Sequence, residues 1–503
     1  DCNSTQELVE WLRNLQAEHH ISFIPPVKPE PNKDEPSEDN IDELRESLLN
    51  KACILQEQNP EEAIFFENLA WWLEFHRRED KPVHWRHFDR LGQPDELLED
   101  DADCISNCSR TSEPPFKPTS RSRSLAYRYQ FDPEQPLKKL AEQYFIQGLY
   151  DEKGFAQRIK TVVDESDPGE GLITLKTSLD ELPENINLIP DERVPNKIIQ
   201  RSLRKVIQAI AEEKTASHQA IISFLRRQRP KFEPAIDGAI VKSQSPEDRL
   251  KEVINAVSSL DNSYLPIQGP PGTGKSYTGA RIIGYLIQQG ARVGICSNSH
   301  KAILNLLKGT ASYCIQQGIS ANFACSKAEG EETLLEQLGI VVQTNSKLAD
   351  EIEDACVIGT TAWGFSRDDF ANQFDYLFID EAGQVSVANL IAISRSSRNL
   401  ILMGDQMQLG QPTQASHPGD SGLSILDYLL HKTPAIPDDR GVFLATTFRM
   451  HPEVNRFISE HIYDGKLQSA TETAQRQILV PDDYRGPMNK PAGIVFVPVN
   501  HQG

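Results

Sequence analysis

The chain has 503 residues, with 52 Lys or Arg against 73 Asp or Glu, so its formal net charge is -21. At about 100–200 residues per domain, this length predicts two to four domains. A run of about 18 apolar residues does not occur, which excludes a membrane-spanning helix. Eight scattered Cys indicate a reducing, cytoplasmic setting rather than a disulfide framework. The strong acidity argues against a surface that binds nucleic acid throughout, and a first residue Asp1 in place of Met predicts a fragment of a longer chain.

The acidity is concentrated near the N-terminus. Residues 1–125 hold 14 basic and 27 acidic residues, a balance of -13, and the remaining 378 residues account for only -8. We expect residues 1–112 to form an acidic, partly disordered helical connector, with loose linkers at 25–40 and 95–118. Between the linkers, aromatic residues recur at helical spacing in 64–91, which favours core packing over a base-stacking surface.

Residues 113–235 are predicted to form a small antiparallel β-barrel-like unit followed by a basic helical stalk. Short β-prone runs separated by turn residues occur at 127–131, 144–149, 156–163 and 172–175. In 197–231, nine basic residues face only Glu212 and Glu213. Because apolar residues recur at helical spacing there, the basic residues lie on an outer helix face. Two interpretations stay open: an ordinary solvated face, or a surface that follows a phosphate backbone.

From residue 265 onward, short apolar strands alternate with helices, a pattern typical of a parallel α/β sheet. The expected strands are 265–268, 293–297, 355–359, 376–379 and 400–403. We place this domain at residues 236–435.

The first of these strands leads into a complete phosphate-binding loop (P-loop) motif. Its residues are Gly269, Pro270, Pro271, Gly272, Thr273, Gly274, Lys275 and Ser276. Its glycines let backbone N–H groups surround phosphate oxygens, and the following helix adds its positive N-terminal dipole. Lys275 is expected to reach the β- and γ-phosphates, while Ser276 places its hydroxyl on Mg²⁺.

Two further strand ends carry complementary chemistry. The fourth strand is followed by Asp380 and Glu381, with Gln384 close behind. Asp380 is expected to hold the metal, and Glu381 to orient and deprotonate the attacking water. The fifth strand is followed by Asp405 and Gln408, and an amide held in this turn can report whether a γ-phosphate is present.

Taken in order, these motifs resemble superfamily 1 helicases, in the group whose second motif reads Asp-Glu-Ala-Gly. The resemblance covers about 236–470 and includes three more motifs. Those motifs are Ser297-Asn298-Ser299-His300-Lys301, Gly359-Thr360-Thr361 and Thr447-Phe448-Arg449-Met450-His451-Pro452. The resemblance implies a RecA-like sheet, strand contacts by Ser297, Asn298, Ser299, His300, Thr360 and Thr361, and a γ-phosphate contact by Arg449. It also implies ATP-driven 5′-to-3′ movement on single strands.

A narrower likeness concerns bacterial RecB-like nuclease–helicase fusions, through residues 85–89 and 299–303. A nuclease precedes the helicase in those proteins, so a covalently linked nuclease domain is an expected partner. Within this chain the nearest approximation to a nuclease cluster is 237–242, and we expect it not to be one.

The chain also departs from the family. After Gly465 it continues only to Gly503, so residues 436–503 are expected to be an incomplete second RecA-like domain. The late motifs, with a second arginine finger, are missing, and Gln244 is a poor match to the adenine-reading glutamine. Loss of an arginine finger costs about 10³–10⁵ in turnover in related chemistry. We therefore expect binding of ATP and single strands with slow hydrolysis.

The sequence thus predicts an ATP- and Mg²⁺-dependent helicase or translocase module that acts on single-stranded DNA. Two alternatives remain: an RNA helicase of the same group, and an ATP-regulated clamp or scaffold that does not unwind.

Overall fold

The computed structural model describes residues 9, 11–16, 18, 38–120, 122–152, 154–179, 181–243, 245–431, 433–481, 483–487 and 490–499. The chain divides into two compact units, Asp1–Glu43 and Leu44–Gly503. Most of the first unit, including residues 25–37 of the predicted linker, lies outside the described residues. In the second unit, Gln244 also lies outside them. Within the described part, no helix combines the length and apolar character that crossing a membrane requires.

Three helices open the described part: α2 (Glu38–Leu55), α3 (Pro60–Leu73) and α4 (Phe75–Gly92). Asn59 caps α3 by accepting a hydrogen bond from the Glu62 N–H, and Pro60 fills the first turn, where no donor is needed. Most of the aromatic stripe is core, as predicted: Phe65, Phe66 and Trp72 are buried. Trp85 and Phe88 on α4 differ, being 69% and 66% exposed.

The expectation of a loose linker at 95–118 is wrong. This stretch contains α5 (Asp95–Glu99) and β1 (Ile105–Arg110). Two of its acidic residues, Asp101 and Asp103, accept hydrogen bonds from the guanidinium of Arg90. Leu98 and Ile105 are fully buried. The acidic stretch that the sequence predicts to be solvated is therefore an ordered connection between α4 and the barrel.

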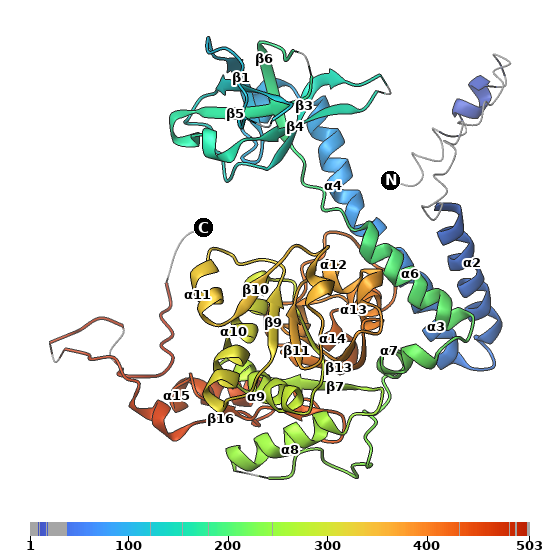
Figure 1. The fold of residues 1–503 in the computed structure, drawn as a ribbon, viewed down its shortest axis with the longest axis vertical. Coiled ribbons are helices and arrows are strands. Elements are labelled where there is room, and N and C mark those ends of the chain that lie inside the picture. Colours follow the sequence, from blue (N-terminus) through green and yellow to red (C-terminus); the bar gives the residue numbers. More distant parts are fainter. Residues whose placement is uncertain are drawn as a thin grey trace. The chain divides into compact units, whose positions relative to one another are not determined.

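Residues 105–190 form a closed antiparallel barrel with strand order β1-β2-β5-β4-β3-β6 (Figure 1). Its remaining strands are β2 (Leu125–Gln130), β3 (Gln143–Tyr150), β4 (Ala156–Thr161), β5 (Leu172–Thr177) and β6 (Asn185–Pro190). Alternate residues point inward, and Tyr129, Tyr144 and Leu188 fill the interior. The barrel predicted from four strand runs is confirmed, with β1 and β6 closing it.

Helices α6 (Lys197–Ala211) and α7 (Gln219–Leu225) follow the barrel. The apolar face of α6 packs on α13 (Val387–Ser394). Six of the nine basic residues in 197–231 form surface ion pairs with acidic residues of the same chain. The pairs are Lys205–Asp368, Lys214–Glu212, Arg226–Glu62, Arg227–Asp420, Arg229–Asp439 and Lys231–Asp261. This pairing favours a structural face over a phosphate-following surface.

The predicted parallel α/β sheet is confirmed and has eight strands in the order β10-β9-β11-β8-β12-β13-β7-β14. The strands are β7 (Tyr264–Gln268), β8 (Val293–Cys296), β9 (Asn322–Cys325), β10 (Ile340–Val342), β11 (Cys356–Gly359), β12 (Phe374–Ile379), β13 (Ser397–Gly404) and β14 (Val442–Phe443). All seven pairings are parallel. Five of the strands match the predicted ones, and β9, β10 and β14 were not predicted.

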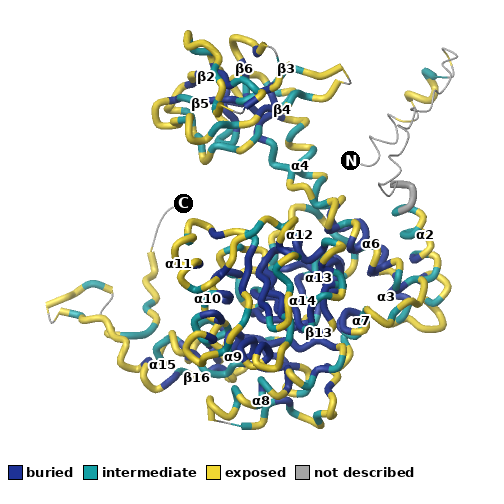
Figure 2. The backbone as a smooth tube through the Cα atoms, viewed as in Figure 1, coloured by how far each residue is buried: buried dark blue, intermediate teal, exposed yellow. Residues whose placement is uncertain are grey.

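Helices cover the sheet, whose strands are almost entirely buried (Figure 2). The further helices are α8 (Pro246–Ser258), α9 (Lys275–Gln288), α10 (His300–Gln317), α11 (Glu332–Gln337), α12 (Ala362–Phe365), α14 (Ile425–Leu430) and α15 (Pro452–Ile462). Burial on both faces explains why the strands read as continuous apolar runs instead of alternating patterns.

The last described part packs against the end of the sheet. β14 lies beyond residue 435, where we placed the end of the first RecA-like domain, yet it pairs with β7. After it come β15 (Thr446–Thr447), α15 and β16 (Gln468–Ser469). A separate apolar cluster holds this region together and includes Ile436, Phe443, Tyr463 and Leu467.

Candidate nucleotide and nucleic-acid site

The strand order brings the predicted motifs to one edge of the sheet. In a parallel sheet the carboxyl ends of all strands meet at the same edge, where α/β proteins bind ligands. The three nucleotide motifs follow β7, β12 and β13, which are contiguous in the sheet. The two predicted strand-binding motifs follow β8 and β11, which are also adjacent, and β8 pairs with β12. The two groups therefore meet at a single strand boundary.

The P-loop has the backbone that phosphate binding requires. Gly272 and Gly274 have φ angles of 76° and 79°, in the left-handed region that favours glycine. At Gly269, a Cβ would lie 2.3 Å from Lys275 Cγ, so a side chain has no room. Lys275 Nζ donates to the Gly269 carbonyl at 2.8 Å, which keeps the ammonium over the loop. Gly274 stands directly before α9, whose N-terminal N–H groups face the same space.

The carboxylates after β12 differ in environment. Asp380 is buried and accepts a hydrogen bond from the Glu381 N–H. Burial, together with the nearby Glu381 charge, raises the pKa of Asp380 to about 6, and Lys275 opposes the shift. Glu381 has φ 53° and ψ 44°, a conformation that costs a non-glycine residue about 1–3 kcal/mol. Such strain at a strand end is typical of residues held in position for function.

This donor set fits Mg²⁺. The hydroxyl of Ser276, which is exposed, and the carboxylate of Asp380 are oxygen ligands, the kind that Mg²⁺ prefers. Mg²⁺ is usually bound by one or two protein groups, with water and substrate phosphates completing the octahedron. A buried carboxylate that is disfavoured as an anion also gains from a divalent cation beside it.

Asp405 faces protein, while Gln408 stands at the edge of the site. The Asp405 carboxylate accepts hydrogen bonds from Gln408 Nε2 at 3.0 Å and from the Tyr463 hydroxyl at 2.7 Å. Because an amide nitrogen carries two hydrogens, Gln408 keeps a second one for another acceptor. Gln384 is predicted to bind the cofactor, and in the structure its backbone carbonyl accepts a hydrogen bond from Asn298 Nδ2 at 2.6 Å.

The segment that contains Arg449 docks on the P-loop. The Phe448 N–H donates to the Gly272 carbonyl at 2.8 Å, and Thr447 Oγ1 donates to the Pro271 carbonyl at 2.9 Å. A Cβ added to Gly272 would lie 2.3 Å from Arg449 Cβ. The structure therefore places the predicted arginine directly against the loop that would hold phosphate, and Arg449 itself is exposed.

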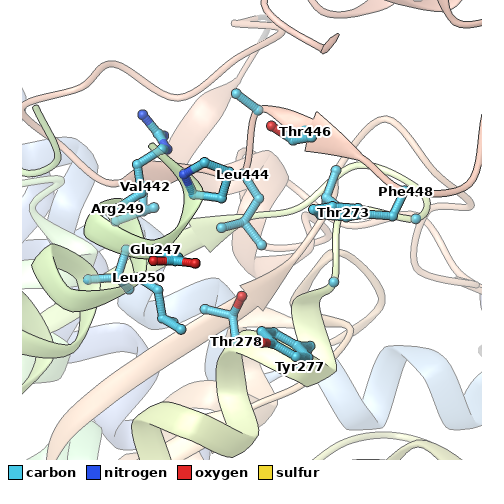
Figure 3. A pocket seen from close by; sticks show the side chains of 15 residues that line it. Glu247, Arg249, Leu250, Thr273, Tyr277, Thr278, Val442, Leu444, Thr446 and Phe448 are labelled. Atoms are coloured by element: carbon cyan, nitrogen blue, oxygen red, sulfur yellow. The ribbon is translucent and has the colours of Figure 1, made fainter. Parts of the chain in front are cut away.

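A cavity of about 510 Å³ opens beside the P-loop (Figure 3). Mostly apolar side chains line it, including Leu250, Tyr277, Val442 and Leu444. Arg249 also lines it, but its guanidinium donates to the carbonyls of Ser243 and Phe443. The lining offers flat apolar contact of the kind a nucleotide base requires.

The predicted nucleic-acid residues split into two sets. Ser297, Thr360 and Thr361 are buried, and the Thr360 hydroxyl donates to Asn345 Oδ1 at 2.8 Å. Asn298 and Ser299 are exposed, and His300 is half-buried at the start of α10. Burial and the Lys327 charge lower the pKa of His300.

The loop after Gln408 is tied to α4. Glu79 accepts hydrogen bonds from the N–H groups of Gln414 at 3.0 Å and Ala415 at 3.1 Å. His417 Nε2 lies 2.7 Å from the same carboxylate, and the His417 ring stacks on Phe75. The carboxylate of Glu79 therefore connects α4, the helix that leads to the barrel, with the loop that follows Gln408.

Sequence reasoning missed three side chains at this site: Gln268, Thr447 and Tyr463. Gln268 ends β7, and its side-chain oxygen accepts from the Ile436 N–H at 2.8 Å. Thr447 belongs to a predicted motif, but the sequence gives no sign of its contact to Pro271. A buried Asp at a strand end signals that donors must be nearby, but nothing in the sequence identifies Tyr463 as one of them.

This fold and this loop define a P-loop nucleotide-binding domain of the RecA-like α/β class. Residues 248–480 match the family model described as AAA domain. The chain is 28% identical over 225 residues to the DNA replication ATP-dependent helicase/nuclease dna2 of Schizosaccharomyces pombe, covering 43% of this chain and 16% of that protein. It is 28% identical over 259 residues to the ATP-dependent helicase NAM7 of Saccharomyces cerevisiae, covering 44% of this chain and 26% of that protein. The predicted resemblance to superfamily 1 helicases is confirmed.

Among solved structures, the Pif1 helicase from Candida albicans matches with a TM-score of 0.24 and 18% identity, covering 48% of this chain and 50% of that one. The chain spans about a quarter or less of the length of the relatives dna2 and NAM7. The narrower likeness to RecB-like fusions is not confirmed by these comparisons.

Proposed function

We propose that this chain is the ATP-hydrolysing motor module of a nucleic-acid helicase or translocase that acts on single strands. The observation that supports it best is the strand order, which groups the nucleotide motifs on β12-β13-β7 and the strand-contact motifs on β11-β8. A motor needs both sites on one rigid element, and the sheet edge supplies it.

On the nucleotide side, each residue has a role that follows from its position. Lys275, with its ammonium over the P-loop, would exchange the Gly269 carbonyl for β- and γ-phosphate oxygens. Glu381 would orient the attacking water and take its proton. Gln408 would donate to the γ-phosphate, and Arg449 would add positive charge from the docked segment. Ser276 and Asp380 would hold Mg²⁺, which when bound neutralises charge on the phosphates.

On the strand side, we propose contacts by Asn298, Ser299 and His300, and by the backbone around Ser297, Thr360 and Thr361. Backbone amides and hydroxyls position a phosphate chain without adding formal charge. DNA is the favoured strand because one relative carries DNA replication in its name. A relative described as Regulator of nonsense transcripts 1, from Caenorhabditis elegans, keeps RNA open as the alternative.

A nuclease in the same polypeptide is a further part of the proposal, since dna2 is described as a helicase/nuclease. A reducing, cytoplasmic setting is also proposed, and the seven described cysteines are free thiols. The rival function is an ATP-regulated clamp that binds strands without unwinding.

The test is ATPase activity of residues 1–503 with Mg²⁺, with and without single-stranded DNA or RNA, at two salt concentrations. We expect hydrolysis that single strands accelerate, an acceleration that weakens at higher salt as counterion release predicts, and a stronger effect of DNA. Lys275→Ala should lower the rate by about 10²-fold or more, because it removes a preorganised charge from the phosphates. Lys138→Ala, an exposed lysine of the barrel region, is the charge-matched control and should leave the rate unchanged.

Three results would count against the proposal. Hydrolysis that survives Lys275→Ala would show that another site, or a contaminant, turns over ATP. Equal rates with and without strands would leave an ATPase that is not a motor. A complete polypeptide that keeps its full function as Lys275→Ala would favour the clamp. Rapid strand-stimulated turnover would support the motor and contradict the expected slow hydrolysis.

A further inference from the structure

Asp405 is a buried carboxylate held by neutral groups. It stands directly after β13 and is 2% exposed. One oxygen accepts from the Met407 N–H at 3.3 Å and lies 3.5 Å from Gln268 Nε2. The other accepts from Gln408 Nε2 and from the Tyr463 hydroxyl. All four donors are uncharged, so the carboxylate depends on hydrogen bonds to offset the loss of water.

The donors come from three separate parts of the chain. Gln268 is the last residue before the P-loop, and Gln408 lies in the predicted γ-phosphate-sensing turn. Tyr463 follows α15, in the segment that begins with Thr447 and docks on the P-loop through Phe448 and Gly272. A single carboxylate therefore joins the phosphate loop, the sensing turn and the docked segment.

The Tyr463 contact is the shortest of the four. A hydroxyl that donates to an ionised carboxylate makes a charge-assisted bond, about twice as strong as a neutral one. Burial and the Asp405 charge both raise the pKa of Tyr463, so the hydroxyl keeps its proton and acts as a donor. The ring is anchored separately among Phe443, Ile436 and Leu467, which leaves the hydroxyl as the part that acts on Asp405.

We propose that Tyr463 is a positioning residue for γ-phosphate recognition. It holds Asp405, and Asp405 holds one hydrogen of the Gln408 amide so that the other meets the γ-phosphate. The docked segment, through Tyr463, thereby sets the orientation of the Gln408 side chain, which follows β13. This inference rests on the proposed nucleotide site and adds a residue that none of the motifs contains.

The experiment measures how strongly residues 1–503 prefer a triphosphate over a diphosphate. The readout is the ratio of Kd for ADP to Kd for the non-hydrolysable analogue AMP-PNP, both with Mg²⁺, by titration calorimetry. Gln408→Ala should lower this ratio by about tenfold, since a hydrogen bond to a charged group is lost. Tyr463→Phe should lower it by about three- to tenfold. The double variant should fall no further than Gln408→Ala alone, because Tyr463 acts only through Gln408.

Tyr428→Phe is the matched control. Tyr428 is also 2% exposed, and its hydroxyl donates to the Leu225 carbonyl at 2.6 Å. Its loss should leave the ratio unchanged. If Tyr463→Phe does not fold, Asp405→Asn replaces it, because the amide keeps the size of the carboxylate and weakens the hold on Gln408.

An unchanged ratio in Tyr463→Phe, or a double variant whose loss is the product of the two single losses, would overturn the inference. A wild-type chain that does not prefer AMP-PNP over ADP would overturn it as well. The proposed function fails by a different result, namely absence of ATP hydrolysis, which this binding ratio does not measure.

Discussion

Gly272→Ala tests whether the Arg449 segment is docked on the P-loop in solution. An added Cβ would lie 2.3 Å from Arg449 Cβ and 3.1 Å from the Arg449 backbone nitrogen. The left-handed φ of 76° costs an alanine about 1–2 kcal/mol. Overpacking against the fixed backbone adds about 1–3 kcal/mol. We therefore expect a total loss of about 2–5 kcal/mol, or separation of the docked segment at a similar cost.

Gly290→Ala isolates the backbone part of this cost. Gly290 has φ 81°, and nothing lies within 4 Å of an added Cβ, so only the conformational cost of about 1–2 kcal/mol applies. The measurements are thermal unfolding without nucleotide and hydrogen exchange followed by mass spectrometry. The Phe448 N–H, which donates to the Gly272 carbonyl, is the specific reporter. It should exchange faster in Gly272→Ala and stay protected in Gly290→Ala.

Equal destabilisation by the two variants, with unchanged exchange at Phe448, would refute the docked geometry. The same result would remove the structural basis for placing Arg449 against the phosphates. Nucleotide is left out of both measurements so that damage to phosphate binding cannot imitate loss of docking.

Two further predictions concern stability. Arg90→Ala should lower the free energy of unfolding in urea by about 3–5 kcal/mol, because loss of the 5% exposed guanidinium removes the ion-pair partner of Asp101 and one of the two partners of Asp103 and of Glu192. Arg86→Ala, half-exposed and paired with the same Glu192, should cost under about 1 kcal/mol, and equal costs would contradict the buried anchor. Glu74 has a pKa below its usual 4.5 because, although burial alone would raise it, hydrogen bonds from Arg45 and Arg78 outweigh burial. Its stabilising effect is therefore fully present above about pH 4.5 and is lost as pH falls through the lowered pKa. The stability gap between wild type and Glu74→Gln should shrink from pH 7 to pH 3, and a gap that widens would refute the pairing.

The nucleotide half of the fold could be predicted because its signals are local. Each of the five predicted strands is a short apolar run that ends at a motif, and burial on both faces keeps such runs uninterrupted. A parallel sheet then brings their ends together without further information. The P-loop glycines could be identified for a similar reason, since glycine adopts the left-handed backbone of Gly272 and Gly274 at no steric cost.

The contacts that could not be predicted join residues on different structural elements, where local sequence patterns give no sign of pairing. The run at 99–103 reads as a solvated acidic linker because its partner, Arg90, lies on the preceding helix and gives no local sign of pairing. Asp405 and Tyr463 are separated by 58 residues, and periodicity carries no information over that distance. The strands β10 and β14 have only three and two residues, too short to be distinguished from loops, and β9, although as long as β8, is not followed by a motif.

The strand order also limits how the two halves of the site can communicate. β8 is the only strand-contact element paired with a nucleotide element, and its partner is β12, which carries Asp380 and Glu381. At the carboxyl ends of these strands, two further hydrogen bonds cross the boundary: the Asp380 N–H donates to the Cys296 carbonyl at 2.8 Å, and Asn298 Nδ2 donates to the Gln384 carbonyl. A displacement of the carboxylate turn when the γ-phosphate leaves would therefore reach Asn298 first among the predicted strand contacts. Thr360 and Thr361, which follow β11, have no such direct strand pairing with the carboxylate strand, because β11 pairs with β8 and β9 and not with β12.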